Sequence, residues 1–329
     1  MDFDLTDEQK EIKDVARELL RARSPFAKVR ETAGHQRYDD ALWREIVDLG
    51  WPGIAVAEEY GGQGLGAVEL AVLLEELGYA CAATPFLGTA VAAAVIQAAG
   101  TDELRARVLP KLVHGELRAG IGTRELAADA ERADVLVLLD ADGPQLIDNP
   151  ETEPFQTIDG TRRFATVRGS SGGEPLQTGA AERVYAAVAA EVVGVCQYAL
   201  EMTLEYVKER KQFGVPVGSF QAVSHRCAEM LLHTESARSA AYFAAWAADA
   251  DPERLSEAAA LAAAAAADGG RETTASAIQA HGGIGFTWEA DVHWLYKRAL
   301  VDAGLLGGAT RHRAALARAA AARVAVTAR

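Results

Sequence analysis

The sequence predicts a mostly α-helical protein that carries a small β module in its middle. Apolar residues recur at helical spacing through the first third of the chain and again through its second half. Between them, residues 115–179 combine strand-length apolar runs with prolines and glycines, a pattern typical of short strands and turns. We therefore expect an N-terminal helical domain over residues 1–114, a short β module over residues 115–179 and a C-terminal helical bundle over residues 180–329.

The first helix of the N-terminal domain has a clear start signal. Thr6 is followed three residues later by Gln9, which is the spacing of a capping box, and apolar residues then recur on one face. Further helices are expected over residues 41–49, 67–78, 84–99 and 101–112. Glycines crowd the loop at residues 58–66, where they indicate backbone with positive φ or close contacts.

The β module is predicted from two segments. Residues 134–140 form an apolar run that ends at a turn signal, and residues 163–168 alternate as a half-exposed strand does. Because a strand takes roughly 5 to 6 residues plus a turn, we expect only a handful of strands here.

The C-terminal part is predicted to be a four-helix bundle. Long helices separated by short breaks are expected over residues 183–211, 220–248 and 252–281, with a terminal helix over residues 310–324. The alanine-rich tract at residues 258–267 is typical of a tightly packed helix and is too weakly apolar to span a bilayer.

Composition restricts the class of partner. Lysine and arginine number 33 against 47 acidic residues, so the formal net charge is −14. That balance argues against nucleic acid or an anionic membrane as the main partner. Three cysteines without paired spacing predict neither a disulfide framework nor a metal site. The acidic N-terminus lacks the basic and apolar regions of a signal peptide, and we expect a soluble, cytoplasmic protein.

Residues 210–221 gather side chains that suit a dinucleotide. Two predicted helices are separated here by a turn that brings together the guanidinium of Arg210, two aromatic rings (Phe213 and Phe220) and the amide of Gln221. A guanidinium binds a phosphate through two parallel hydrogen bonds, while rings and amides recognise the rest of a flavin dinucleotide. A capped helix hairpin with surface cations is the alternative interpretation.

A second candidate is the glycine-rich loop that follows residue 281. Gly282 and Gly283 come directly after a predicted helix and would expose backbone N–H groups to a phosphate or sugar, with Gln279 one turn before them. A helix C-cap and a connecting loop would also explain these residues.

Taken in order, these segments resemble the acyl-CoA dehydrogenase family. The matching motifs are Arg-Lys-Gln-Phe-Gly from Arg210, Phe-Gln from Phe220 and Gln-Ala-His-Gly-Gly-Ile-Gly-Phe from Gln279. The glycine-rich loop at residues 58–66 and Leu-Glu-Glu-Leu-Gly at residues 74–78 are similar to the family's first domain. Together the matches cover most of the chain outside the β module.

The resemblance implies a fold and a reaction. The fold is an N-terminal helical domain, a middle β domain and a C-terminal four-helix bundle. The reaction is the α,β-dehydrogenation of an acyl-CoA to the 2-enoyl-CoA. A carboxylate removes the α-proton and FAD accepts the hydride. An electron-transfer flavoprotein is the implied electron acceptor.

The resemblance also implies which residues hold the cofactor. Positions that match six residues of this chain hold the FAD of a neighbouring subunit, around its pyrophosphate and adenosine half, so the working unit is at least a dimer. These six are Arg210, Phe213, Phe220, Gln221, Gln279 and Gly283, with Gln212, Gly214 and Gly282 as their immediate setting.

The sequence departs from the family where the catalytic base should lie. The segment that usually holds the glutamate reads Leu-Leu-Gly-Gly-Ala-Thr over residues 305–310, and leucine cannot accept a proton. In some relatives the glutamate lies near the start of the helix that leads to Arg210, a position that falls here at Val184. Glu182 and Glu191 are nearby candidates; the alternative is that Glu182 is a solvated helix-start acid and that Glu191 is paired internally.

The middle of the chain departs from the family as well. The module is short, and Gly-Thr-Arg-Glu at residues 122–125 is at best a remnant of the family's flavin-ring segment. Residues 158–167 resemble a segment of bacterial members that work as α2β2 assemblies. The main hypothesis is therefore one subunit of a heteromeric enzyme, which completes an FAD site without supplying the base. A self-sufficient homo-oligomer and a flavin-free scaffold are the alternatives. The acyl chain is not fixed by the sequence; steroid-derived acyl-CoAs are suggested by analogy alone.

Overall fold

The N-terminal helices begin largely where local signals place them. In the computed structural model, which describes residues 4–169 and 172–327, the Thr6 side chain accepts a hydrogen bond from the Gln9 backbone and the Gln9 side chain accepts one in return. One helix was not expected, because its N-cap, Pro25, offers no side-chain acceptor. The helices are α1 (Asp7–Arg23), α2 (Phe26–Gly34), α3 (Asp40–Asp48), α4 (Ala67–Tyr79), α5 (Phe86–Ala99) and α6 (Asp102–Val113).

The segment between the two helical parts of the sequence forms a mixed sheet. Its seven strands run in the order β5-β6-β2-β1-β3-β4-β7; β1 and β3 are parallel and the other neighbours are antiparallel. More strands fit than expected, because two of them have only two residues. The strands are β1 (Ala119–Gly122), β2 (Ala127–Ala128), β3 (Val135–Asp140), β4 (Gly143–Asp148), β5 (Thr152–Phe155), β6 (Phe164–Val167) and β7 (Glu174–Pro175).

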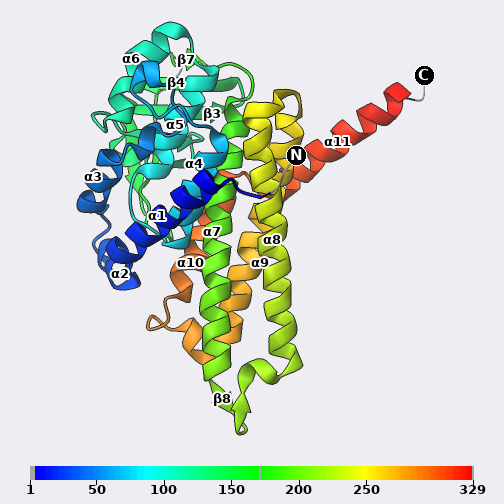
Figure 1. The fold of residues 1–329 in the computed structure, drawn as a ribbon. Helices are drawn as coiled ribbons and strands as arrows, with labels where there is room; N and C mark the ends of the chain where they lie inside the picture. The colour runs from blue at the N-terminus through cyan, green and yellow to red at the C-terminus, as the bar shows by residue number, and fades with distance from the viewer. Residues whose placement is uncertain (1–3, 170–171, 328–329) are drawn as a thin grey trace.

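The remaining helices form a bundle that extends away from the sheet, with a small β-hairpin at its far end (Figure 1). The helix before the last was not expected from the sequence. The elements are α7 (Ala180–Glu209), β8 (Lys211–Gln212), β9 (Val215–Pro216), α8 (Gln221–Ala250), α9 (Leu255–His281), α10 (Val292–Leu305) and α11 (Ala309–Thr327). The mostly helical fold class that the sequence predicts is confirmed.

Helix α7 forms the centre of the molecule and packs against α4, α8 and α9. Glycine permits the closest of these contacts: a Cβ on Gly78 of α4 would collide with the backbone of Glu191, and one on Gly194 would collide with the backbone of Glu75. By length and hydropathy α7 could cross a membrane, but 72% of its most apolar window is buried inside this chain. Its apolar character is therefore explained by core packing.

Candidate functional site

The far end of the bundle carries a strained aromatic turn. Because Gln212 pairs with Val215, Phe213 and Gly214 form the two-residue loop of a hairpin, with φ of +53° and +83°. Two positive φ values define a type I′ turn, which normally places asparagine or glycine at its first position. Phe213 is nevertheless a phenylalanine and is 94% exposed. Strain and apolar exposure at one residue are typical of a binding element.

Arg210 and Phe220 flank this turn. Arg210 is the exposed C-cap of α7, and among the residues that the structure describes its guanidinium has no ion-pair or hydrogen-bond partner. The ring of Phe220, which is 39% exposed, meets the ring of Phe213 edge-on at 6.3 Å. Gln221, the first residue of α8, is exposed beside it.

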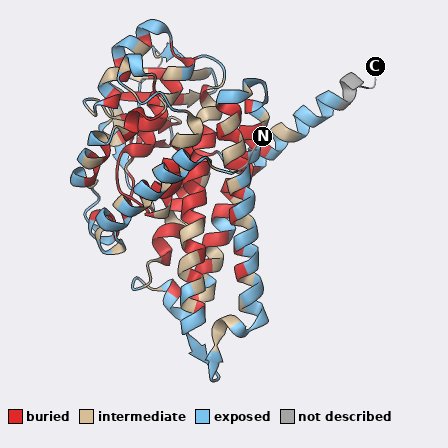
Figure 2. Ribbon diagram, in the orientation of Figure 1, coloured by how far each residue is buried: buried red, intermediate tan, exposed pale blue. Residues whose placement is uncertain are grey.

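The glycine-rich loop lies at the same end of the molecule. His281, at the end of α9, stacks on Tyr206 of α7 at 4.5 Å, four residues before Arg210. Gly282 has φ of +65°, and a Cβ on either Gly282 or Gly283 would meet no atom within 4 Å, which leaves room for a ligand. Figure 2 shows this end of the bundle as solvent-exposed. Exposure is shared by all nine predicted residues: Arg210, Gln212, Phe213, Gly214, Phe220, Gln221, Gln279, Gly282 and Gly283.

The side chains at this end fit the pyrophosphate and adenosine half of FAD. An unpaired guanidinium supplies charge for phosphate oxygens, and two exposed rings and two exposed glutamines supply stacking surface and amide hydrogen bonds. Because these residues are exposed in one chain, a ligand bound here would be enclosed only if residues of another chain also contacted it.

The two positions considered for the base hold buried apolar residues. Val184 is 2% exposed and Leu306 is fully buried, and both belong to the main hydrophobic core. Glu182 is half-buried in the first turn of α7.

Glu191 lies inside the protein between two arginines. One carboxylate oxygen accepts hydrogen bonds from Arg162 at 2.5 Å and from Arg298 at 2.7 Å, and the residue is 2% exposed. This placement favours internal pairing over a role as base, because a base needs an open edge toward its substrate.

Glu191 belongs to a buried ionic network that joins three parts of the chain. Arg298 of α10 donates to Asp159, in the β5–β6 connection, at 2.7 Å, and to the backbone carbonyl of Ala82 at 3.3 Å. Arg162, also in that connection, donates to Asp302 of α10 at 2.7 Å. The network consists of Asp159, Thr161, Arg162, Glu191, Arg298 and Asp302.

The network contains three carboxyl groups but two guanidinium groups, and a fourth buried carboxyl group, that of Asp129, lies 3.9 Å from Arg162. Burial and the nearby charge of Glu191 raise the pKa of Asp302 to about 8. The raised pKa means that burial among other acids favours the neutral form of Asp302. Oε2 of Glu191 and Oδ2 of Asp302 are buried without a hydrogen-bond partner among the described residues.

Sequence reasoning did not find this network. A local signal existed in α10, where Arg298 and Asp302 lie four residues apart and so face the same side of the helix. Their partners, however, are more than 100 residues away along the chain.

Comparison with known proteins gives a consistent result. The chain matches the families described as "Acyl-CoA dehydrogenase, N-terminal domain" over residues 6–116 and "Acyl-CoA dehydrogenase, C-terminal domain" over residues 177–321. "Acyl-CoA dehydrogenase IpdE2" of Mycolicibacterium smegmatis is 36% identical over 276 residues, which cover 82% of this chain and 85% of that protein.

Two solved structures are similar over almost the whole chain. A variant of the steroid ACAD Tcur3481-Tcur3483 has a TM-score of 0.86 and 28% identity, covering 97% of this chain and 99% of that one. The ChsE4-ChsE5 complex from Mycobacterium tuberculosis gives a TM-score of 0.85 and 25% identity, covering 98% and 99%.

Proposed function

The chain belongs to the acyl-CoA dehydrogenase family, and we propose that it is one subunit of a heteromeric FAD-dependent enzyme, where it completes a partner's FAD site without supplying the base. One observation carries the proposal. The predicted FAD-binding residues are all exposed at one end of the bundle, whereas both base positions hold buried apolar side chains.

This chain's contribution to the reaction is to bind and orient. Arg210 pairs with the pyrophosphate, Phe213 and Phe220 cover ring surface, and the amides of Gln221 and Gln279 give directional hydrogen bonds. The backbone at Gly283 permits close approach of the ligand. When bound, FAD supplies the acceptor for the hydride that leaves the β-carbon of the acyl-CoA.

The proton at the α-carbon is removed by a carboxylate of the partner subunit. In this chain Glu191 is held by Arg162 and Arg298 within the core, where an acyl-CoA does not reach it without breaking two charge-assisted hydrogen bonds. This division of roles is the one expected for the α2β2 assemblies that the sequence resembles. Because one similar structure is a steroid ACAD, a steroid-derived acyl-CoA is the first substrate to test.

The test compares the chain alone with the chain co-expressed with a candidate partner that carries the missing glutamate. We expect little FAD and no turnover alone, and FAD with acyl-CoA turnover in the complex, with electrons passed to an electron-transfer flavoprotein. Full FAD occupancy and turnover by the chain alone would overturn the proposal.

Two variants separate the alternatives. A self-sufficient homo-oligomer that uses Glu191 or Glu182 as base would lose flavin reduction in Glu191→Gln or Glu182→Gln, whereas the proposal expects Glu182→Gln to leave turnover of the complex unchanged. A co-expressed complex that assembles but lacks the flavin absorption band would identify the chain as a flavin-free scaffold.

A further inference from the structure

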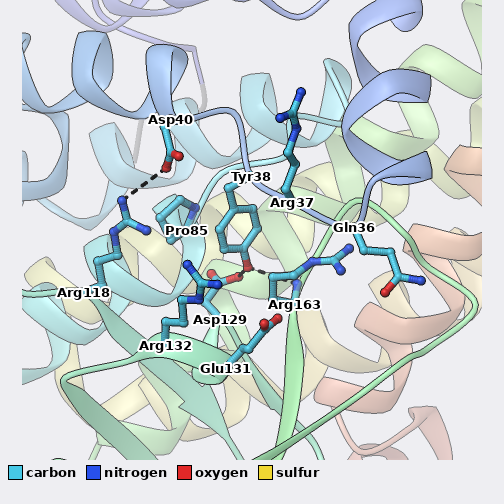
Figure 3. Close-up of a pocket in the computed structure, with 10 residues that line it drawn as sticks. All are labelled: Gln36, Arg37, Tyr38, Asp40, Pro85, Arg118, Asp129, Glu131, Arg132 and Arg163. Atoms are coloured by element: carbon cyan, nitrogen blue, oxygen red, sulfur yellow. Dashed lines mark hydrogen bonds and ion pairs between the residues drawn. The ribbon is translucent and has the colours of Figure 1, made fainter.

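A second concentration of arginines lies far from the bundle end. An opening between the α2–α3 loop and the β module is lined by four arginines, which is unusual in a protein with a net charge of −14 (Figure 3). The four are Arg37, Arg118, Arg132 and Arg163.

Two of these arginines are neutralised by neighbouring carboxylates. Arg37 donates to Glu31 at 2.8 Å, and Arg118 donates to Asp40 at 3.4 Å.

The other two have unused donors. Within the described parts of the chain, the exposed guanidinium of Arg132 has no hydrogen-bond or ion-pair partner. Arg163 donates one N–H to the carbonyl of Gly160, while its Nε is buried without a partner. A buried N–H without an acceptor costs free energy that a bound anion would recover.

The acids at the floor of the opening do not compete for these donors. Asp129 accepts a hydrogen bond from the Tyr38 hydroxyl and another from the backbone N–H of Gly88, the latter at 2.7 Å, so that it caps α5. The Tyr38 hydroxyl in turn accepts from the backbone N–H of Arg163 at 3.0 Å. Glu131 on the rim is the one lining carboxylate without a partner among the described residues.

The size of the opening selects a small ligand. Its volume is about 100 Å³, close to that of three water molecules at roughly 30 Å³ each, and well below the roughly 300–1,000 Å³ of pockets that enclose a drug-sized molecule. A tetrahedral oxyanion fits this volume and accepts hydrogen bonds from guanidinium groups in several directions.

We propose that this opening is a binding site for a phosphate group, held by Arg132 and Arg163 above the Tyr38–Asp129 pair. The phosphate is either free inorganic phosphate or the terminal phosphate of a larger ligand such as coenzyme A. The site is separate from the bundle end and does not depend on the subunit role proposed above.

The test is calorimetric titration of the full-length protein with sodium phosphate at constant ionic strength, with sodium chloride as the reference. We expect a single site. Arg132→Gln and Arg163→Gln should each weaken binding by about tenfold, the loss of one charge-assisted pair. Glu131→Gln should tighten binding, because it removes a competing negative charge. Arg168→Gln, an exposed arginine of the same module, is the matched control and should change nothing.

Coenzyme A and dephospho-coenzyme A, which lacks the 3′-phosphate, distinguish the source. Tighter binding of coenzyme A than of either phosphate or dephospho-coenzyme A assigns the site to the 3′-phosphate of a coenzyme A ester; equal binding of phosphate and coenzyme A assigns it to free phosphate. The proposal is overturned if neither probe binds, or if binding survives unchanged in both arginine variants.

Discussion

The interior of the molecule and the far end of its bundle hold arginines in opposite settings. Arg162 and Arg298 are buried, and carboxylates from three parts of the chain satisfy their guanidinium groups. Arg210 is exposed, and no described residue satisfies its guanidinium group. The first arrangement is complete within one chain and therefore serves folding. The second leaves a guanidinium group exposed to solvent, where it is available to the FAD proposed above.

The strongest test of this contrast is Arg298→Met compared with Arg210→Met. Removing Arg298 leaves Asp159 and Glu191 buried with insufficient positive charge, so we expect the free energy of unfolding to fall by about 3–5 kcal/mol. Arg210→Met should change it by less than about 0.5 kcal/mol. Urea unfolding followed by circular dichroism measures the free energy of unfolding of both variants. Equal losses of stability would contradict the contrast between the buried and the exposed arginine.

The pH dependence of stability tests the raised pKa of Asp302. The pKa of Asp302 is raised from an unfolded value of 3.8 to about 8, so the folded state binds more protons than the unfolded state between these values. Stability is therefore lost as pH rises from about 5 to 8, at about 1 kcal/mol per pH unit.

Asp302→Asn isolates this effect from other titrating groups. The amide keeps an oxygen acceptor for Arg162 but does not ionise, so the variant should show a flatter curve of unfolding free energy between pH 5 and 8 than the unmodified protein. If the curves of unfolding free energy against pH are parallel for the two proteins, the pKa of Asp302 is not raised in the folded state.

At the exposed end, Arg210→Gln should reduce FAD affinity and leave stability unchanged. Loss of a charge-assisted contact to the pyrophosphate is expected to cost about 1.5–3 kcal/mol, or roughly tenfold to a hundredfold in affinity. Titration of the assembled complex with FAD, followed by flavin fluorescence, measures the FAD affinity of each variant. Lys211→Gln, at the neighbouring exposed cation, is the control and should have a smaller effect.

The smallest expected effect concerns the strained turn. Phe213→Asn places a residue that tolerates positive φ before Gly214, and should raise the free energy of unfolding by up to about 1 kcal/mol. The same change should weaken FAD binding, because a ring is lost. Val215→Asn, outside the turn, should give no gain in stability. A stabilised variant with unchanged FAD affinity would show that the ring has no role in the site.

The limits of sequence reasoning follow the same contrast. Helices with local signals, such as α1 behind Thr6, were predicted closely, whereas α2 behind Pro25 was not. Strands β2 and β7, each two residues long, depend on pairing with distant strands and leave no pattern of their own.

The same holds for the sites. The exposed motif from Arg210 to Gln221 is continuous in the chain and could be recognised. The network around Arg298 could not be predicted, because it forms only when residues from separate parts of the chain meet.

Helix α7 has one more consequence. Its 30 residues span about 45 Å, and it runs unbroken from the sheet to the aromatic hairpin. Because its two ends lie so far apart, substitutions at one end and at the other should have different consequences. Changes near its start should be tolerated only where this chain still folds. Under the subunit role proposed above, changes at its end should be tolerated only where the partner subunit and its FAD are still bound. Under that proposed role the hairpin should vary in step with the partner's sequence, whereas the residues of the ionic network should vary in step with one another.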